Sequence, residues 1–406
     1  MDTVIVNPNN RILSPFAAIE PPLWLGLIAT HYRTKGKEVA IVDAEALDLT
    51  VEQTAEAIRK LCPKEVIVVV AGNNPSVSST PKMVVTRKLV ELLKDNVPTL
   101  VTGLHPSALP KETEEELGVK VMAGKVFDGT PNMPWDLLNP HNYRAHNWHC
   151  LNGSLRQPYG VTYTSLGCPF SCSFCNIHAL YGGSHKVWYR SGSEVVKEID
   201  TLAERYKVHN IKFWDELFTL NPKHVDTICD LLIERNYDLN IWAYARADCV
   251  SKHLLRKMRK AGIKWLAYGF ESGSDSCLTV VNKKASIHDA REVVCLTHDA
   301  DINIIGNFIY GLGYDEETLA FAKSLELEYV NFYEVKPYPG SSLYKKDTNW
   351  NTYSQFGDEH TFRDDAFISF FGDGEYLQRI KRKFGPQVVE HINKVLEFGK
   401  PQALST

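Results

Sequence analysis

Residues 167–175 have the sequence Gly-Cys-Pro-Phe-Ser-Cys-Ser-Phe-Cys, which places Cys168, Cys172 and Cys175 in a C-x3-C-x2-C array. The array directly follows residues 161–165, an apolar segment whose composition predicts a strand. A loop with these gaps can wrap three thiolates around one corner of an iron–sulfur cubane, because thiolates are the natural ligands of such clusters. Three protein ligands leave one iron without a cysteine, and that iron can bind a substrate.

Two other interpretations of the cysteines remain open. His178 could join them as the fourth ligand of a zinc site with the spacing C-x3-C-x2-C-x2-H. The three thiols could also be buried without a function. A disulfide framework is not expected, because the number of cysteines is odd, at nine, and the first ten residues predict no signal peptide.

Strands and helices alternate from the cysteine array toward the C-terminus. Predicted strands are residues 161–165, 211–214, 241–244, 265–269, 302–309 and 329–334, and predicted helices are residues 193–206, 222–234, 252–261, 288–299 and 316–327. Six strands alternating with helices predict a partial, open (β/α)6 barrel of the TIM type, with functional residues at the carboxyl ends of the strands. A polar stretch follows from about residue 341, and residues 375–398 predict a closing helix.

The first third of the chain predicts a separate α/β domain. Its predicted strands are residues 4–6, 39–42, 66–71, 99–102 and 119–122, separated by predicted helices at residues 23–34, 51–61, 82–93 and 111–117. This alternation is typical of a Rossmann-like open parallel sheet, in which ligands bind beyond the carboxyl ends of the strands. No G-x-G-x-x-G follows the first strand, which disfavours a nicotinamide or flavin dinucleotide. We expect domains at 1–128 and 159–345, a linker at 129–158, and a C-terminal helical region at 346–406.

The bulk composition is that of an ordinary globular protein. The chain has 406 residues, 44% hydrophobic and 23% charged, with a formal net charge of −4. No apolar run reaches the ~18 residues that a spanning helix needs, so we expect a cytoplasmic protein without a membrane partner. Basic side chains crowd residues 252–264 and 379–383, but such runs are usually solvated helix faces, so a nucleic acid is not indicated.

The cysteine array and several later motifs resemble the radical S-adenosylmethionine (SAM) superfamily. The aromatic Phe174 stands just before the third cysteine, as it does in that family. The later matches lie at predicted strand ends: an acidic pair in FWDELF (213–218), an arginine in ARAD (245–248), and the segments GFESGS (269–274), FIYGLG (308–313) and KPYPGS (336–341). In the fourth of these, Gly313 stands where the family has a proline.

The resemblance implies a [4Fe–4S] cluster held by Cys168, Cys172 and Cys175, with no further catalytic residue that can be assigned. It also implies a SAM site, in which an acidic pair meets the SAM amino group, an arginine meets its carboxylate, and a glycine-rich strand approaches the adenine. The residues expected to bind SAM on this basis are Phe174, Asp215, Glu216, Arg246, Glu271, Gly311 and Tyr338.

The N-terminal region resembles the cobalamin-binding domain that one subgroup of this superfamily carries. The similar segments are EPPLWLGL (20–27), KGKEV (35–39) and TGLHPSALP (102–110). The sequence has no D-x-H-x-x-G motif, and the acidic run after the last strand is absent. The resemblance implies cobalamin binding by residues at the strand ends, for which the candidates are Asn74, Ser76, Gly103 and His105. A histidine in such a loop more often forms a hydrogen bond than ligates a metal, and this applies to His105.

The resemblance implies reductive cleavage of SAM to a 5′-deoxyadenosyl radical, followed by a cobalamin-dependent methyl transfer to a carbon centre. The expected partners are a small-molecule or peptide substrate and an electron donor such as flavodoxin or ferredoxin. Three alternatives stay open: a radical SAM enzyme that performs cyclisation, rearrangement or methylthiolation, an enzyme with a vestigial cobalamin domain, and a non-catalytic iron–sulfur redox module. We also expect the sheet edge near residues 73–76 and 103–105 to face the mouth of the barrel near the cysteine array at 168–175.

Overall fold

The computed structural model describes the chain except for residues 11–14, 73, 347–348, 350–352, 354–360 and 400–406. The chain forms two compact units. The first unit contains Met1–Arg144, Gln157–Val208 and Lys336–Phe356, and the second contains Ala145–Arg156, His209–Val335 and Gly357–Thr406. The cysteine array therefore belongs to the same unit as the N-terminal sheet.

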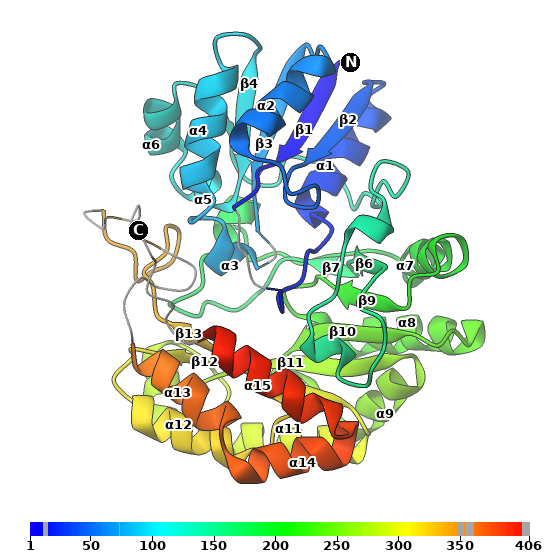
Figure 1. Ribbon diagram of the computed structural model, residues 1–406, viewed down its shortest axis with the longest axis vertical. Helices are drawn as coiled ribbons and strands as arrows, with labels where there is room; N and C mark the ends of the chain where they lie inside the picture. Colours follow the sequence, from blue (N-terminus) through cyan, green and yellow to red (C-terminus); the bar gives the residue numbers. More distant parts are fainter. Residues whose placement is uncertain (11–14, 73, 347–348, 350–352, 354–360, 400–406) are drawn as a thin grey trace. The chain divides into compact units, whose positions relative to one another are not determined.

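A five-stranded parallel sheet with the order β2-β1-β3-β4-β5 forms the N-terminal part of the first unit (Figure 1). Its strands are β1 (Thr3–Asn7), β2 (Val39–Asp43), β3 (Glu65–Val70), β4 (Thr99–Gly103) and β5 (Lys120–Met122). The longer helices between them are α1 (Leu23–Thr34), α2 (Val51–Lys60), α4 (Met83–Leu93) and α6 (Pro110–Leu117). Each element overlaps its predicted segment, so the predicted Rossmann-like sheet is confirmed.

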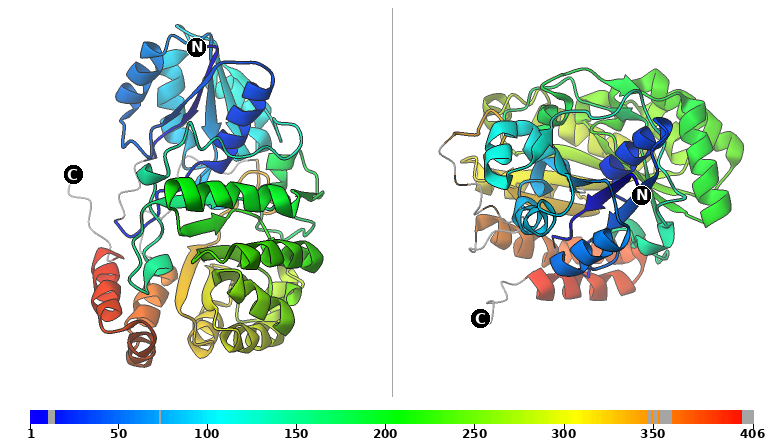
Figure 2. Two further views of the ribbon diagram at one scale, coloured as in Figure 1. Left: turned by 90° about the vertical axis from the view of Figure 1, so that its right-hand side faces the viewer. Right: turned by 90° about the horizontal axis from the view of Figure 1, so that it is seen from above.

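Helices cover both faces of this sheet, as a parallel sheet requires (Figure 2). On one face, buried valines of β1 and β3 pack against apolar side chains of α2 and α4. Helix α1 buries most of its length and packs against β1 and β2. Thr50 begins α2 with a capping box, in which its hydroxyl accepts a hydrogen bond from the Gln53 N–H and the Gln53 side chain accepts one from the Thr50 N–H.

Two short helices occupy strand ends where the sequence predicts loops. Helix α3 (Pro75–Ser78) follows β3, and helix α5 (Leu104–Ala108) follows β4 without an intervening loop. Asn73, which belongs to the first predicted loop, lies outside the described residues. The turn into α5 depends on Gly103, whose φ is +119° and whose Cβ, if it had one, would collide with the Val70 backbone. The polar candidates at this sheet edge therefore lie on helical turns.

The remainder of the first unit corrects two predictions. The segment predicted as one strand at 161–165 is divided into β6 (Tyr159–Thr162) and β7 (Ser165–Leu166), and β7 pairs antiparallel with β8 (Trp188–Tyr189). Helix α7 (Gly192–Asp200) is shorter than predicted and continues as a π-helical turn at Thr201–Arg205. The pairing of β7 with β8 makes the cysteine-bearing segment a loop with closed ends.

Five parallel strands in the order β13-β12-β11-β10-β9 form the sheet of the second unit. They are β9 (Asn210–Phe213), β10 (Asn240–Ala245), β11 (Ile263–Glu271), β12 (Asn303–Tyr310) and β13 (Tyr329–Glu334). Its helices are α8 (Pro222–Arg235), α9 (Lys252–Lys260), α10 (Asp275–Val280), α11 (Ile287–Asp299) and α12 (Asp315–Ser324). The alternation predicted from the sequence is confirmed here. Among the described residues, no helix is long and apolar enough to cross a membrane.

Three helices close the chain where one was predicted. They are α13 (Phe362–Phe371), α14 (Gly374–Phe384) and α15 (Gln387–Gly399). The predicted single helix at 375–398 is wrong because Gly385 adopts a φ of +93° and Pro386 follows it. A glycine and a proline together end a helix, so the sequence did contain a signal for this break.

Candidate cluster and cofactor site

The cysteine loop leaves β7 and returns through β8, so its two ends are joined by a short ladder that pairs Leu166 with Trp188. Gly167 begins the loop with a φ of +99°, and a Cβ atom there would collide with the carbonyl oxygen of Lys186. Only glycine fits this close approach of the two loop ends. Cys168 is therefore held next to a fixed ladder, although the rest of the loop lacks strand structure.

Hydrogen bonds inside the loop fix the three cysteines relative to one another. The Cys175 N–H donates to the Cys172 carbonyl at 3.1 Å, and Nε2 of His178 lies 2.8 Å from the Cys168 carbonyl. All nine cysteines of the chain are described and none forms a disulfide. Burial raises the pKa of the Cys175 thiol to about 12, although hydrogen bonds from the Ile177 N–H and the Ser76 hydroxyl act in the opposite direction. Iron binding would have to displace this proton.

The loop carries the donors for both metal sites that the sequence allows, namely the thiols of Cys168, Cys172 and Cys175 and the imidazole of His178. Within the described parts of the chain, no group of three His, Cys, Asp or Glu side chains is close enough to hold one metal ion. A tetrahedral zinc site needs four ligand atoms within ~2.3 Å of one centre, whereas a cubane spreads its cysteines over separate irons. The His178 imidazole is also engaged with the loop backbone. The assignment of the three cysteines to a cluster therefore stays a prediction.

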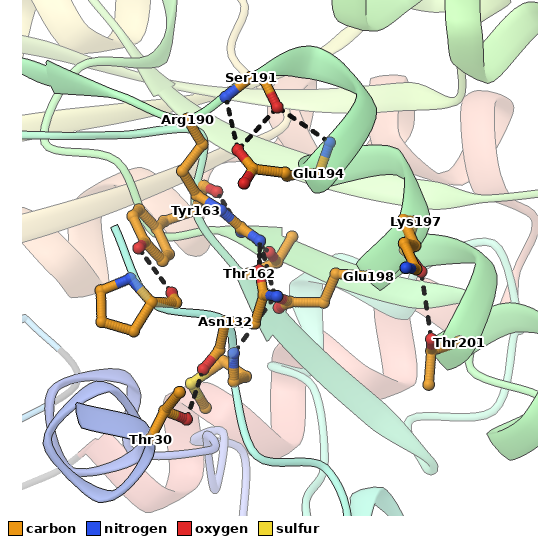
Figure 3. A network of polar contacts seen from close by, with 12 residues as sticks. Thr30, Asn132, Thr162, Tyr163, Arg190, Ser191, Glu194, Lys197, Glu198 and Thr201 are labelled. Atoms are coloured by element: carbon orange, nitrogen blue, oxygen red, sulfur yellow. Dashed lines mark hydrogen bonds and ion pairs between the residues drawn. The ribbon is translucent and has the colours of Figure 1, made fainter. Parts of the chain in front are cut away.

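A buried arginine, Arg190, is at the centre of a network of polar contacts that includes Thr162, Tyr163 and Glu198 (Figure 3). Arg190 directly follows β8, and its guanidinium donates to Thr162 Oγ1 at 3.1 Å and to the Tyr163 carbonyl at 2.9 Å, both just before the loop. It also forms an ion pair of 2.9 Å with Glu198 of α7 and a hydrogen bond with the Asn132 side chain. One fully buried side chain thus connects β6, β8, α7 and the segment that follows the N-terminal sheet.

The carboxyl edge of the N-terminal sheet lies against the cysteine loop. Helix α5 packs on the 3-10 turn Ile177–Tyr181, which directly follows the third cysteine. The Ser76 side chain on α3 acts to lower the pKa of the Cys175 thiol, against the larger effect of burial. Within the first unit, this edge therefore contacts the turn that follows the cysteine array, and its expected placement at the mouth of the barrel stays a prediction.

His105 and Asn74 have local roles at this edge. His105 is 1% exposed, and its Nδ1 lies 3.1 Å from the Thr80 hydroxyl. Burial lowers the pKa of His105 to about 3, so the imidazole is neutral. This supports the hydrogen-bonding role that the sequence favours for it. Asn74 accepts a hydrogen bond of 2.5 Å from Ser78 through its carbonyl oxygen and starts the α3 turn.

The segment KPYPGS (336–341) contacts both α5 and the turn that follows the cysteine loop. A Cβ atom on Gly340, whose φ is +89°, would lie 3.1 Å from Ala179, 3.2 Å from Ala108 and 3.4 Å from Asn176. Asn176 donates to the Pro339 carbonyl at 3.0 Å. Tyr338 is almost fully buried. Three motifs that are far apart in the sequence therefore converge in the first unit, whereas Phe174, in the cysteine loop, is partly exposed.

The other residues predicted to bind SAM lie in the second unit, at the carboxyl ends of adjacent parallel strands. Asp215 and Glu216 follow β9, and Asp215 is fully buried. Arg246 follows β10 and pairs with Asp248 through two hydrogen bonds of 2.9 Å each. Glu271 ends β11 with a φ of +66°. Because parallel strands end at one edge, the sheet places these residues at the same edge, and their binding of SAM stays a prediction.

Two charged residues at this sheet were missed by sequence reasoning. Lys283 forms a buried ion pair of 2.8 Å with Glu271. Lys212 on β9 is 2% exposed, and its ammonium lies 4.7 Å from the ring centre of Trp242 and 5.8 Å from that of Tyr244. A lysine within an apolar strand beside tryptophans is a sequence signal for such a cation–π contact. Gly311, the remaining predicted residue, follows β12 with a φ of +88°.

Comparison with known proteins identifies two domains. The Radical SAM superfamily matches residues 162–325, and the B12 binding domain matches residues 12–128. The chain therefore carries both domains of the cobalamin-binding subgroup that its motifs resemble, and it is a radical SAM enzyme. Its cofactors are accordingly a [4Fe–4S] cluster, SAM and cobalamin.

Individual relatives support this assignment at low identity. An uncharacterised methyltransferase of Pyrococcus horikoshii is 26% identical over 375 residues, covering 80% of this chain and 78% of the relative. The anaerobic magnesium-protoporphyrin IX monomethyl ester cyclase of Cereibacter sphaeroides is 23% identical over 414 residues, covering 85% of this chain and 63% of the relative.

A solved structure shares the fold. The radical SAM methyltransferase TsrM of Kitasatospora setae, solved with cobalamin and a [4Fe–4S] cluster, matches with a TM-score of 0.66 at 17% identity. The match covers 84% of this chain and 74% of that chain. It confirms the predicted fold class, an N-terminal parallel sheet followed by a partial barrel.

Proposed function

We propose that this chain is a cobalamin-dependent methyltransferase that transfers a methyl group to a carbon centre by radical SAM chemistry. The observation that carries the proposal is the packing of α5, in the B12-binding domain, on the turn Ile177–Tyr181 that directly follows the cysteine loop. A methyl donor and a radical source must act on one substrate atom, and a misplacement of ~1 Å can cost ~100-fold in rate. The contact between α5 and the turn after the cysteine loop supports the proposal, because it brings the two cofactor-binding parts of the chain close together.

The cofactors, when bound, supply an electron for SAM cleavage and a methyl group for transfer. The protein binds and orients them. In this proposal Cys168, Cys172 and Cys175 hold the cluster. Glu216 and Arg246 hold the amino and carboxylate ends of SAM through charge-assisted hydrogen bonds. The edge with Asn74, Gly103 and α5 receives the corrin. The substrate is a small molecule or peptide, the electron donor is a flavodoxin or ferredoxin, and the enzyme acts in the cytoplasm.

A single-turnover experiment without substrate tests the proposal. The protein is reconstituted anaerobically with iron, sulfide and hydroxocobalamin, gel-filtered, reduced and given SAM labelled in its methyl group. We expect about one corrin per chain, labelled methylcobalamin, and S-adenosylhomocysteine as the other product. Protein that retains no corrin after gel filtration would contradict the cobalamin assignment.

The same reaction mixture separates the alternatives. The similarity to a cyclase keeps a non-methylating radical SAM enzyme as the second candidate. Such an enzyme would release 5′-deoxyadenosine and methionine, but no S-adenosylhomocysteine. A non-catalytic redox module would release neither product, although its cluster would still be reduced.

A further inference from the structure

The carboxyl end of β11 has an irregular backbone at Glu271. Strands β11 and β12 pair one to one as far as Gly269 and Asn307, but the next pair joins Glu271 to Phe308, so β11 contains one extra residue at this point. Glu271 itself has a φ of +66°, a value that residues other than glycine rarely adopt. A bulge re-aims the side chain beside it, and strained backbone of this kind is typical of residues at a binding site.

Helix α12 holds the residues that follow Glu271. The Gly273 N–H donates to Thr318 Oγ1 at 3.1 Å, and the Ser272 hydroxyl lies 3.1 Å from the same oxygen. A Cβ atom on Gly273 would lie 2.5 Å from the carbonyl oxygen of Glu317, so this segment packs closely on the helix. The backbone conformation of Glu271 is therefore fixed by its surroundings and not by its own preference.

The Glu271 carboxylate is held by a buried lysine. The Lys283 ammonium donates to Oε1 of Glu271 at 2.8 Å, and each of the two residues is 8% exposed. A Cβ atom on Gly269 would collide with this Oε1 and would lie 3.0 Å from the ammonium, so the glycine leaves room for the pair. The Lys283 backbone N–H also donates to the Leu278 carbonyl of α10 at 2.8 Å. The lysine is thus fixed both at its backbone and at its ammonium.

We propose that Lys283 is a positioning residue, which fixes the Glu271 carboxylate in the orientation that binds SAM. The ion pair engages one oxygen of the carboxylate, and the second oxygen can accept a hydrogen bond from a ligand. A buried ion pair is seldom more stable than apolar side chains of similar volume, and the positive φ of Glu271 adds strain. The two unfavourable features at one strand end indicate a binding role for the pair. The inference rests on the proposed function and on the predicted role of Glu271 in binding SAM.

A double-mutant cycle separates positioning from general stabilisation. The dissociation constant of SAM is measured by equilibrium dialysis in the reconstituted full-length protein, and iron content is measured in parallel. Glu271→Gln should weaken SAM binding about tenfold, because an amide oxygen is a weaker acceptor than a carboxylate. Lys283→Met alone should also weaken it about tenfold, because the carboxylate loses its fixed orientation. In the Glu271→Gln background, Lys283→Met should have almost no further effect, since Lys283 acts through Glu271.

Lys284→Met is the matched control, because Lys284 is the next residue and is exposed, and this variant should bind SAM like the parent. Lys283→Gln keeps a hydrogen-bond donor beside Glu271 and provides a second cycle if Lys283→Met does not fold. An equal loss of affinity from the Lys283 substitution in both backgrounds would overturn the inference, because independent structural effects add. Parent-like affinity in either single variant would also overturn it. A parent protein that binds no SAM would instead overturn the proposed function.

Discussion

Arg190 and Glu198 form an ion pair of 2.9 Å in which the arginine side chain is 0% and the glutamate side chain 4% exposed. Arg190 also donates to Thr162 and Tyr163, just before the cysteine loop, and the Glu198 carboxylate also accepts a hydrogen bond of 3.2 Å from the Met133 N–H. Buried charges are costly unless they are paired and hydrogen-bonded. The stability of the segments next to the cysteine loop therefore depends on the ion pair between Arg190 and Glu198.

Replacement of Arg190 by methionine should lower the free energy of unfolding by about 3–5 kcal/mol, because it leaves the Glu198 carboxylate buried without its partner. Urea unfolding followed by circular dichroism measures this change. The double variant Arg190→Met/Glu198→Gln, which buries no charge, should lose less than the single variant. Arg33→Met is the control, since the ion pair of Arg33 with Asp136 is about half exposed and should cost less than about 1 kcal/mol. Equal losses of stability for the Arg190 and Arg33 variants would show that the buried pair of Arg190 and Glu198 has no special stabilising role.

Single replacement of Cys168, Cys172 or Cys175 by alanine should abolish iron binding. Anaerobically reconstituted parent protein should contain about four irons per chain, as a cubane requires, and each variant should contain almost none. Cys62→Ala and Cys295→Ala serve as controls, because both residues are exposed and lie outside the loop. Iron and zinc analysis of the same samples decides between the interpretations. Stoichiometric zinc in the parent protein, with no iron chromophore, would show that the cluster assignment is wrong.

Replacement of Arg246 or Glu216 by alanine should weaken SAM binding without removing iron. A hydrogen bond to a charged group contributes about 1.5–3 kcal/mol, so the dissociation constant should rise roughly tenfold to hundredfold. Equilibrium dialysis with labelled SAM measures it, and iron content is measured in parallel. Arg259→Ala is the control, because Arg259 on α9 pairs with Asp301 at a partly exposed site. Parent-like SAM affinity in both variants would refute the predicted SAM site.

The sequence correctly predicted those parts of the fold that depend only on residues close together in the chain. The C-x3-C-x2-C spacing defines a ligand loop regardless of the rest of the fold, and β-branched runs such as β3 favour strands by their own composition. By contrast, Arg190 reaches Asn132 and Asn176 reaches Pro339 only after the chain has folded. No periodicity connects such distant positions, so these contacts could not be predicted from one sequence.

The errors in the predicted fold have a similar physical origin. The strand at 161–165 was predicted as continuous because its residues are apolar, but the ladder between Leu166 and Trp188 depends on a partner far along the chain. The break between α14 and α15 was predictable from Gly385 and Pro386. At the SAM edge, the sequence identified Glu271 but not its partner Lys283, since ion pairing across a turn and a helix leaves no local pattern.

Acidification should destabilise the second unit through Glu328, which precedes β13. Its carboxylate is 2% exposed and lies 2.9 Å from Lys383 and 3.2 Å from His298, and the Ile304 N–H donates to it at 2.7 Å. Burial opposes ionisation, but the bond with His298 and the charge of Lys383 outweigh it and lower the pKa of Glu328 from 4.5 to about 2. Because the folded pKa is depressed, the stabilisation is present above the unfolded pKa and is lost as the pH falls from about 4.5 through about 2.

A shift of this size corresponds to about 3 kcal/mol of the free energy of unfolding at neutral pH. Glu328→Gln should therefore lower stability at pH 7 and flatten its dependence on pH between 5 and 2, as measured by urea unfolding at a series of pH values. Glu390→Gln is the matched control, since Glu390 pairs with Lys394 at an exposed helical i,i+4 site, and such pairs contribute only about 0.3–0.5 kcal/mol. If both variants keep the parent's slope in acid, the ion pairs around Glu328 are not what anchors the C-terminal helices to the sheet of the second unit.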